Sequence, residues 1–325
     1  MSFKSILFDI VKPCGLFSFT KRVAKGHPRI LMYHRISGSS NDGGLPVDIF
    51  RKQIKTIKNS FNVTTIPELI SSCANGDPIQ DAVVVTFDDG YHDFADYAFP
   101  VLQEEAVPAV LFATTGFIDS DLWLWPDQIR YAVEHRGNRS INISGVQGSL
   151  DNNISDHNCW NAIADHCLKL APNQRKGVIS ELYENVEIPL PDRAPDQFRS
   201  LSWGQIKDMK KLGLSVESHS YSHPVLTTLT EQEIFEELRK SKETIKDELG
   251  SDVEGFCYPN GMKCDFDKRV KRALVGLGYQ WAVTAYPTPS PLADLFEISR
   301  YNAGPSMDDY LKTVFGVKYL SMRLG

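Results

Sequence analysis

Short runs of apolar residues alternate along this chain with longer stretches in which apolar residues recur at helical spacing. This alternation is typical of βα units, in which helices connect parallel strands. Runs that are apolar almost throughout, such as AVVVTF at 82–87, predict strands that are buried on both faces. The predicted strands are 29–33, 82–87, 109–114, 214–218, 255–258 and 281–284. We therefore expect an α/β fold built on a parallel sheet.

Amphipathic stretches between these runs predict helices at 48–59, 203–212, 230–249 and 266–277. The third begins with Thr230 and has Glu233 three residues later, a pair typical of an N-terminal capping box. Gly250 follows its last apolar residue, as is common where a helix ends. Both ends of this helix are therefore predicted.

The stretch from about residue 121 to 200 breaks the alternation. It contains no predicted strand, and prolines interrupt its helical patches at 125–135 and 158–170. These prolines are Pro172, Pro189, Pro191 and Pro195. We interpret the stretch as a mainly helical cap inserted into one domain that spans residues 28–325.

Residues 1–27 form an amphipathic segment whose apolar positions are broken by Asp9, Lys12 and Pro13. No run approaches the roughly 18 apolar residues of a membrane span. The segment also lacks the apolar core and small-residue cleavage site of an export signal. We therefore expect a cytoplasmic protein. Peripheral membrane contact through residues 1–25 is the alternative for this segment.

The composition narrows the function classes. The chain has 325 residues with 35 Lys and Arg against 41 Asp and Glu, and the basic residues form no runs. This balance argues against a protein that binds nucleic acid through its phosphates. The six cysteines form no Cys-x-x-Cys pair, and without an export signal we expect free thiols rather than disulfides.

Two adjacent carboxylates, Asp88 and Asp89, directly follow the 82–87 run. Barrel and open-sheet α/β folds place their active sites at the C-terminal ends of strands. Neighbouring strand residues point to opposite sides, so both carboxylates can face one pocket only if the strand has ended there. Gly90 would permit that turn. The alternative is a helix N-cap followed by a first-turn acid.

His219 and His223 follow the predicted strand 214–218. Two imidazoles and one carboxylate leave open positions on a divalent metal for water and substrate. A single histidine is more often structural. A His-x-x-x-His pair together with an Asp-Asp pair, both at the ends of apolar strands, favours a metal site.

Four segments resemble the polysaccharide deacetylase family, the NodB-homology carbohydrate esterases: TFDDG (86–90), HSYSH (219–223), FCYPNG (256–261) and WAVTA (281–285). The resemblance extends from about residue 28 to 316, with 121–200 in a part that varies within the family. It implies a distorted (β/α) barrel of about seven strands with the helical cap inserted. It also implies that Asp88 is a general base and that Asp89, His219 and His223 hold Zn²⁺ or another divalent ion such as Co²⁺, Ni²⁺ or Mn²⁺.

The implied reaction removes an N-acetyl group from an N-acetylated sugar or polysaccharide precursor. A bound metal lowers the pKa of water from about 15.7 towards about 7 and polarises the acetyl carbonyl. By motif alignment the backbone N–H of Asn260 would stabilise the oxyanion, although Pro-Asn-Gly is also an ordinary turn sequence. Two alternatives remain. One is a deformylase or other amide hydrolase acting on a lipid- or nucleotide-linked amino sugar, and the other is a catalytically inactive sugar-binding relative.

The chain departs from the family pattern at the general acid. Most members carry an acid histidine near the C-terminus, but no histidine follows His223 here. One subset of the family opens with a Tyr-His-x-Ile segment that supplies this acid, and residues 33–36 (YHRI) resemble it. We therefore assign the acid role to His34. A core histidine is the alternative, and His92 is a weaker candidate for the acid.

A second departure concerns the third motif. Many relatives have an arginine there that tethers the catalytic aspartate, and the aligned residue in this chain is Cys257. Arg300 follows another short apolar stretch and would fill that role, with a solvated surface arginine as the alternative. Trp281 resembles an aromatic residue that lines the family's substrate groove, and it fits a core position equally well.

Overall fold

The computed structural model describes residues 15–38, 43–119, 122–148 and 150–324. Its centre is one curved sheet in which every pairing is parallel. In spatial order the strands are β10 (Tyr301–Asn302), β1 (Arg29–Tyr33), β5 (Ala82–Asp89), β6 (Val110–Ala113), β7 (Ser215–Ser218), β8 (Gly255–Cys257) and β9 (Trp281–Val283), and β4 (Asn62–Val63) also pairs with β5. A separate two-stranded sheet joins β2 (Ile36–Ser37) to β3 (Leu45–Pro46).

One short segment brings the two edges of the curved sheet together. Ile298 forms a parallel bridge with Val283 of β9, and the adjacent β10 pairs with β1. The amide of Ile298 donates to the carbonyl of Ala282 at 2.9 Å, which fixes the segment against β9. The sheet therefore curls into the distorted (β/α) barrel that the family resemblance implied.

All six predicted strands are present, with ends that differ by at most two residues. The predictions missed β2, β3, β4 and β10, because two residues are too few to form a hydrophobic pattern. Strand β5 is longer than predicted and continues through Asp89. The expectation that the strand ends before the Asp pair was therefore wrong.

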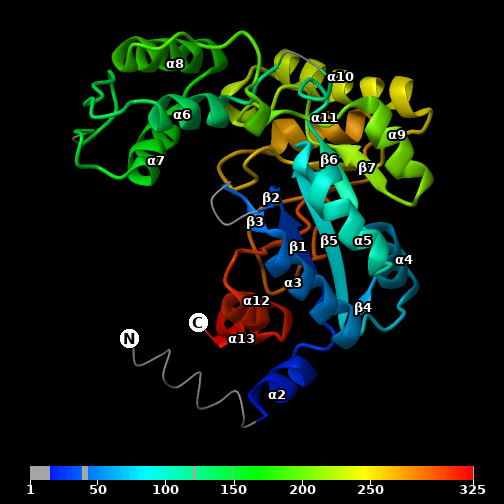
Figure 1. The fold of residues 1–325 in the computed structure, drawn as a ribbon. Coiled ribbons are helices and arrows are strands. Elements are labelled where there is room, and N and C mark those ends of the chain that lie inside the picture. Colours follow the sequence, from blue (N-terminus) through cyan, green and yellow to red (C-terminus); the bar gives the residue numbers. More distant parts are fainter. Residues whose placement is uncertain (1–14, 39–42, 120–121, 149, 325) are drawn as a thin grey trace.

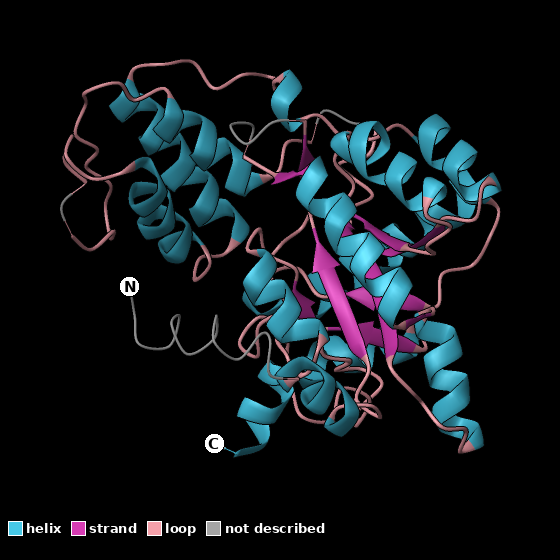
Figure 2. Cartoon of the chain, turned by 60° about the horizontal axis from the view of Figure 1, so that its bottom comes forward, coloured by secondary structure: helices cyan, strands magenta, loops and turns pink. Residues whose placement is uncertain are grey.

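Helices cover the outside of the sheet (Figures 1 and 2). They are α2 (Leu16–Val23), α3 (Val47–Ser60), α4 (Ile66–Asn75), α5 (Phe99–Glu104), α9 (Trp203–Lys211), α10 (Glu231–Leu249), α11 (Lys268–Gly276), α12 (Met307–Val314) and α13 (Val317–Leu324). The four predicted helices correspond to α3, α9, α10 and α11. Thr230 and Glu233 form the predicted capping box of α10, and Gly250 ends the helix with a left-handed φ of 66°.

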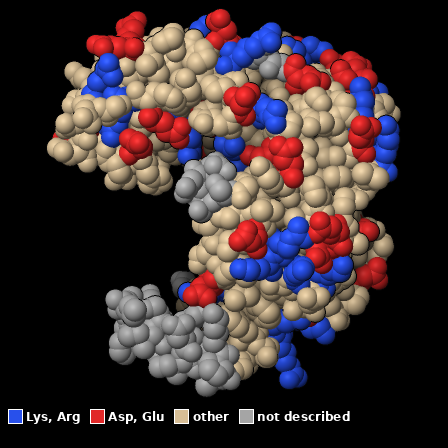
Figure 3. All heavy atoms as spheres, viewed as in Figure 1, with Lys and Arg blue, Asp and Glu red and all other residues tan. Residues whose placement is uncertain are grey.

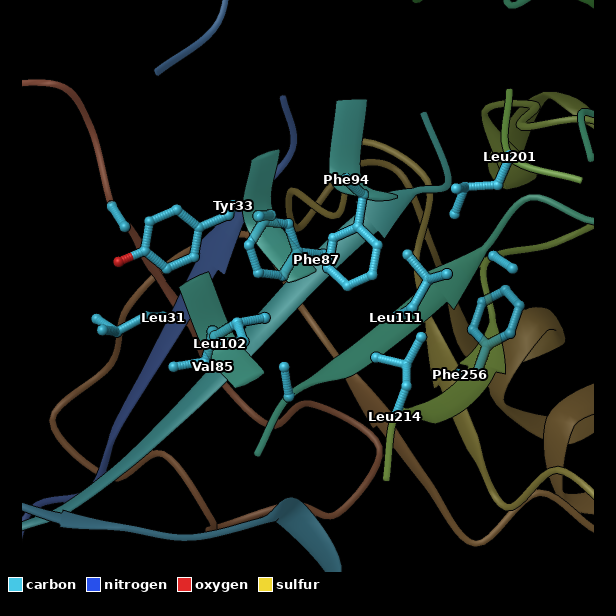
Figure 4. Packing of buried hydrophobic residues seen from close by; sticks show 14 of the residues in the cluster. Leu31, Tyr33, Val85, Phe87, Phe94, Leu102, Leu111, Leu201, Leu214 and Phe256 are labelled. Atoms are coloured by element: carbon cyan, nitrogen blue, oxygen red, sulfur yellow. The ribbon is translucent and has the colours of Figure 1, made fainter. Parts of the chain in front are cut away.

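Alternate residues of the strands enter two different apolar cores, because successive side chains of a strand point to opposite faces. Leu31, Val85 and Phe87 pack between the sheet and the outer helices (Figure 4). Ile30 and Trp281 belong to a second cluster that fills the barrel interior. Trp281 is 2% exposed, so it is a core residue and the groove-lining interpretation was wrong.

The predicted cap contains three helices, α6 (Trp125–Glu134), α7 (Asp156–Cys167) and α8 (Pro172–Val186). They pack around an apolar cluster of their own that includes Ile129, Ile163 and Leu182. The three helices lie together, apart from the outer helices of the barrel (Figure 1). Pro172 was predicted to interrupt a helix but is the first residue of α8, a position where its missing N–H removes no helical hydrogen bond.

Much of the predicted N-terminal amphipathic segment, residues 1–14, lies outside the described residues. Its described part contains α2, on which Phe19 and Val23 are exposed. Among the helices the structure describes, none has both the length and the apolar character needed to cross a membrane. The cysteines within the described ranges are free, as predicted. On the face in Figure 3, acidic and basic side chains are interspersed, without a large area of one sign.

Candidate active site

A cavity of about 560 Å³ opens at the C-terminal ends of the barrel strands, between the barrel and the cap. Every site residue predicted from the sequence lines it: His34, Asp88, Asp89, His219, His223, Asn260 and Arg300. Parallel strands end at the same edge of a sheet, and this brings together residues that are up to 266 positions apart (300 − 34).

Asp89, His219 and His223 form a compact group of ligand atoms that we call the ligand triad. One ligand atom from each lies within 4.8 Å of the others. Oδ1 of Asp89 is 3.5 Å from Nε2 of both histidines. The imidazole centroids are 4.9 Å apart, with the rings inclined at 77°. The three predicted metal ligands therefore converge on one point.

Both histidines of the ligand triad are in the form that binds metal. Nδ1 of His219 lies 2.8 Å from the carbonyl oxygen of Cys257, so Nδ1 carries the proton and Nε2 faces Asp89 with its lone pair. Burial lowers the pKa of His219 to about 4, although the charge of Asp88 opposes this shift. Burial also lowers the pKa of His223 well below its ordinary value, and the neighbouring His219 adds to the shift. Both imidazoles are neutral at neutral pH, as metal ligation requires.

Asp89 is the member of the ligand triad that most needs a cation. Its Oδ1 is buried and has no hydrogen-bond partner within the described residues. Burial, followed by repulsion from Asp88, raises the pKa of Asp89 well above its ordinary value. A buried carboxylate without a partner is unfavourable unless an opposite charge lies close to it. The ligand triad therefore fits a divalent ion with open coordination positions.

The backbone is strained at this edge of the barrel. Asp89, Ser220, His223 and Asn260 have φ angles of 73°, 65°, 56° and 59°. Such left-handed conformations cost about 1–3 kcal/mol each for non-glycine residues and concentrate at functional sites. Asp89 still pairs with Ala113 of β6, so its unusual φ, rather than the end of the strand, allows its side chain and that of Asp88 to line one cavity.

Arg300 holds Asp88 in place. Its Nη1 and Nη2 each donate to one carboxylate oxygen of Asp88 at 2.7 Å, a bidentate ion pair. Its remaining donors reach Oγ1 of Thr86 at 2.9 Å, the carbonyl of Thr284 at 2.9 Å and Sγ of Cys257 at 3.0 Å. All five guanidinium N–H groups therefore have a partner. Arg300 is fully buried, so the alternative of a solvated surface arginine was wrong.

This ion pair sets the charge of Asp88. Burial alone would raise the pKa of Asp88, but the charge and hydrogen bonds of Arg300 outweigh burial and hold that pKa well below its ordinary range. Asp88 is therefore ionised at neutral pH, as a proton acceptor must be. Arg300 belongs to the segment that closes the barrel, so the closure of the fold also positions this carboxylate.

His34 directly follows β1, and its Nε2 lies 3.8 Å from Oδ2 of Asp88. Its side chain is 45% exposed, so the alternative of a core histidine was wrong. Desolvation lowers the pKa of His34, while the charge of Asp88 opposes the shift and Arg300 adds to it. Because the ring also contacts solvent, screening weakens all three influences. His34 is placed where a group can exchange a proton with a substrate in the cavity.

Asn260 and His92 occupy different places. Asn260 lines the cavity, and its Nδ2 is buried without a hydrogen-bond partner in the part of the chain that is described. The next amide, Gly261 N–H, donates to the carbonyl of Pro259 at 2.7 Å, so this segment is also a tight turn. His92 lines a neighbouring cavity of about 440 Å³, with its Nδ1 3.0 Å from Asp96. It is therefore not placed to act at Asp88.

The sequence did not identify the cap residues that complete the cavity. Oη of Tyr91 donates to Asp127 at 2.5 Å, which joins the barrel to α6. Burial raises the pKa of Asp127 to about 6. The guanidinium carbon of Arg130 lies 5.2 Å from the ring centroid of Trp160, and both side chains line the cavity. No pattern in the sequence distinguishes these residues from others on amphipathic helices.

A family model described as polysaccharide deacetylase matches residues 75–282, more than half of the chain. A Bacillus subtilis protein provisionally named polysaccharide deacetylase YxkH is 23% identical over 297 residues, which cover 90% of this chain and 76% of that protein. Chitin deacetylase 1 of Cryptococcus neoformans is 41% identical, but over 66 residues only, 20% of this chain and 13% of that protein.

Solved structures with the same fold include two bacterial proteins. The Streptococcus pyogenes deacetylase PplD, determined in complex with acetate, superposes with a TM-score of 0.59 and 19% identity over 88% of this chain and 97% of that chain. IcaB from Ammonifex degensii superposes with a TM-score of 0.60 and 18% identity over 90% of this chain and 97% of that chain. At these identities the likeness establishes the fold.

Proposed function

Since this chain belongs to the polysaccharide deacetylase family, whose members hydrolyse N-acetyl amide bonds, we propose that it is a metal-dependent deacetylase of an N-acetylated sugar or polysaccharide precursor. One observation carries the proposal. An ionised carboxylate, Asp88, and an accessible histidine, His34, lie 3.8 Å apart in the cavity that also contains the ligand triad. These are the groups that amide hydrolysis requires.

Zn²⁺ or a similar divalent ion held by Asp89, His219 and His223 would polarise the acetyl carbonyl and lower the pKa of water from about 15.7 towards about 7. Asp88 takes the proton of the attacking water. Water acidified by such an ion would lose its proton even to a weak base, so a carboxylate paired with Arg300 would be sufficient. Arg300 keeps both oxygens of Asp88 oriented during this transfer.

His34 donates the proton that the leaving nitrogen needs, and after product release the proton held by Asp88 leaves to solvent while His34 is reprotonated. The carbon–nitrogen bond of the tetrahedral intermediate breaks readily only if the nitrogen leaves as a neutral amine rather than as an anion. His34 protonates that nitrogen, and its exposed side chain allows it to do so from the cavity. The backbone N–H of Asn260 would donate to the oxyanion, a contribution worth about 2.7–4 kcal/mol in other hydrolases.

The cap determines which sugar enters. A cavity of about 560 Å³ is within the range of about 300–1,000 Å³ that is usual for small-molecule sites. Trp160 offers an aromatic surface to a sugar ring, and Arg130 beside it offers hydrogen-bond donors to hydroxyl or phosphate oxygens. The cap thus lies opposite the ligand triad and contacts the part of the substrate that does not react.

The test measures acetate released from N-acetylglucosamine oligomers by the purified full chain. We expect release that stops on treatment with a chelator and returns with Zn²⁺ or Co²⁺. His223→Ala should abolish it, whereas His135→Ala, which changes an exposed cap histidine that does not line the cavity, should leave it unchanged. Formate release from N-formyl analogues alone would indicate a deformylase. No hydrolysis of either class by metal-loaded protein would contradict the proposal.

A further inference from the structure

A second set of potential ligands overlaps the ligand triad. Asp88, His219 and Cys257 each offer one ligand atom, and these atoms lie within 4.8 Å of one another. All three residues are buried. A carboxylate, an imidazole and a thiol together bind Zn²⁺ and softer ions such as Cd²⁺ once the thiol has lost its proton. We call this group the thiol set.

The thiol set and the ligand triad compete for one atom. Both include His219, whose Nδ1 is engaged by the carbonyl oxygen of Cys257. Only Nε2 of His219 remains available, and one imidazole nitrogen binds one metal. An ion in the thiol set would therefore remove a ligand from the triad. It would also occupy Asp88, the residue that must stay free to accept a proton.

The guanidinium of Arg300 already contacts two ligand atoms of the thiol set. Arg300 Nη2 lies 2.7 Å from Oδ2 of Asp88 and 3.0 Å from Sγ of Cys257. Nη1 donates a hydrogen bond to Oδ1, the other carboxylate oxygen of Asp88. Hydrogen bonds to Thr86 and Thr284 fix this cation, which is fully buried. A metal ion bound by the thiol set would lie next to this guanidinium. Two positive charges this close in a medium of low dielectric repel each other strongly. The ligand triad has no arginine contact of this kind among the described residues.

We propose that Arg300 excludes metal ions from the thiol set and so confines the ion to the ligand triad. The proposal rests on the proposed function for the location of that first ion. When the guanidinium is absent, a soft divalent cation can occupy its place beside Asp88 and Cys257, displace the thiol proton of Cys257 to solvent water and bind the sulfur as a thiolate. Asp88 then becomes a metal ligand instead of a base. Arg300 is thus a positioning residue with two effects, since it orients Asp88 and selects the metal position.

The experiment titrates the metal-free full chain with Cd²⁺ and follows the ultraviolet thiolate-to-cadmium charge-transfer absorption. All variants carry serine in place of Cys14, Cys73 and Cys264, and the two remaining thiols, Cys159 and Cys167, are buried in the apolar core of the cap. With Arg300 present, we expect one bound Cd²⁺ per chain and no thiolate absorption. Arg300→Met should produce the absorption, and adding Cys257→Ser should remove it. Arg300→Lys, which keeps a cation, should remain without it.

Two results would overturn the proposal. One is a thiolate absorption in the protein with Arg300 that Cys257→Ser removes. The other is a folded Arg300→Met protein that binds Cd²⁺ without any thiolate absorption. If Arg300→Met does not fold, Arg300→Gln replaces it, because glutamine keeps hydrogen-bond donors but carries no charge. Arg300→Gln should also produce the thiolate absorption, and a folded Arg300→Gln protein that binds Cd²⁺ without it would overturn the proposal.

His223→Ala separates this proposal from the proposed function. In the protein with Arg300, His223→Ala should abolish Cd²⁺ binding if the ligand triad holds the ion. In Arg300→Met, the thiolate signal should survive His223→Ala, because His223 does not belong to the thiol set. If the protein with Arg300 still binds Cd²⁺ after His223→Ala, only the assignment of the ion to the ligand triad is refuted.

Discussion

At the scale of single residues, Asp88 meets two requirements that usually conflict. It is buried against the barrel interior, which disfavours a charge, yet the base role that we propose for it requires an ionised carboxylate. The bidentate contact with Arg300 resolves the conflict, because a fixed guanidinium replaces the water that burial removed.

Asp88→Asn should keep the metal and lose most turnover, because an amide has the shape of the carboxylate but cannot accept the proton of water. General-base contributions are about 10²–10⁴-fold, and we expect the loss of kcat for acetate release to fall in this range. Elemental analysis should show unchanged metal content, and Asp96→Asn, at an exposed carboxylate, should be active. Activity above about a tenth of wild type would indicate a different base.

His34→Ala should lower turnover by a factor within the same general acid–base range of about 10²–10⁴ and preserve the metal content. The alkaline limb of the pH–rate profile should flatten, because the group that must stay protonated has been removed. An acetate ester should suffer a smaller loss than an N-acetyl substrate, since an alkoxide leaves more readily than an amide anion. Equal losses on both substrates would make His34 a structural residue.

At the scale of elements, α10 supports the site from outside, because Ser241 on this helix contacts Ser218 at the end of β7, next to His219. Thr230→Ala should destabilise the protein by about 0.5–2 kcal/mol, because the amide of Glu233 loses its capping acceptor. Chemical denaturation measures this change. Thr244→Ala, the same substitution within the helix, should be neutral or stabilising, since alanine has the higher helix propensity. Equal losses of stability at both positions would show that the missing hydrogen bond at the helix N-terminus is not the cause.

The elements also show what the sequence can predict. Helix α10 and strand β5 were predicted because each contains its own signals, a capping box in one and an unbroken apolar run in the other. A metal site could be predicted from strand ends that parallel pairing brings together, whereas the separate roles of base and ligands came from the family resemblance. The contact of Arg300 with Asp88 could be proposed only by analogy, because β10 has two residues and the contact spans 212 positions. Cap residues such as Trp160 approach the site through tertiary packing, which leaves no local pattern.

At the scale of the whole molecule, the barrel and the cap have separate apolar cores, and the cavity lies where the two meet. The ligand triad comes entirely from the barrel, from β5 and the loop after β7. A metal held there, as we propose, would link two strands that lie on either side of β6 in the sheet. Metal binding should therefore stabilise the barrel as a unit.

An ion that binds only the folded chain stabilises it by RT ln(1 + [L]/Kd), about 2.7 kcal/mol at a hundredfold excess over Kd. For a chain of this size each kcal/mol raises Tm by about 2–4 °C or less, so Zn²⁺ should raise Tm by several degrees and a chelator should reverse the gain. His135→Ala should show the same rise. His223→Ala should show none, and an undiminished rise in that variant would mean that the stabilising ion binds outside the ligand triad.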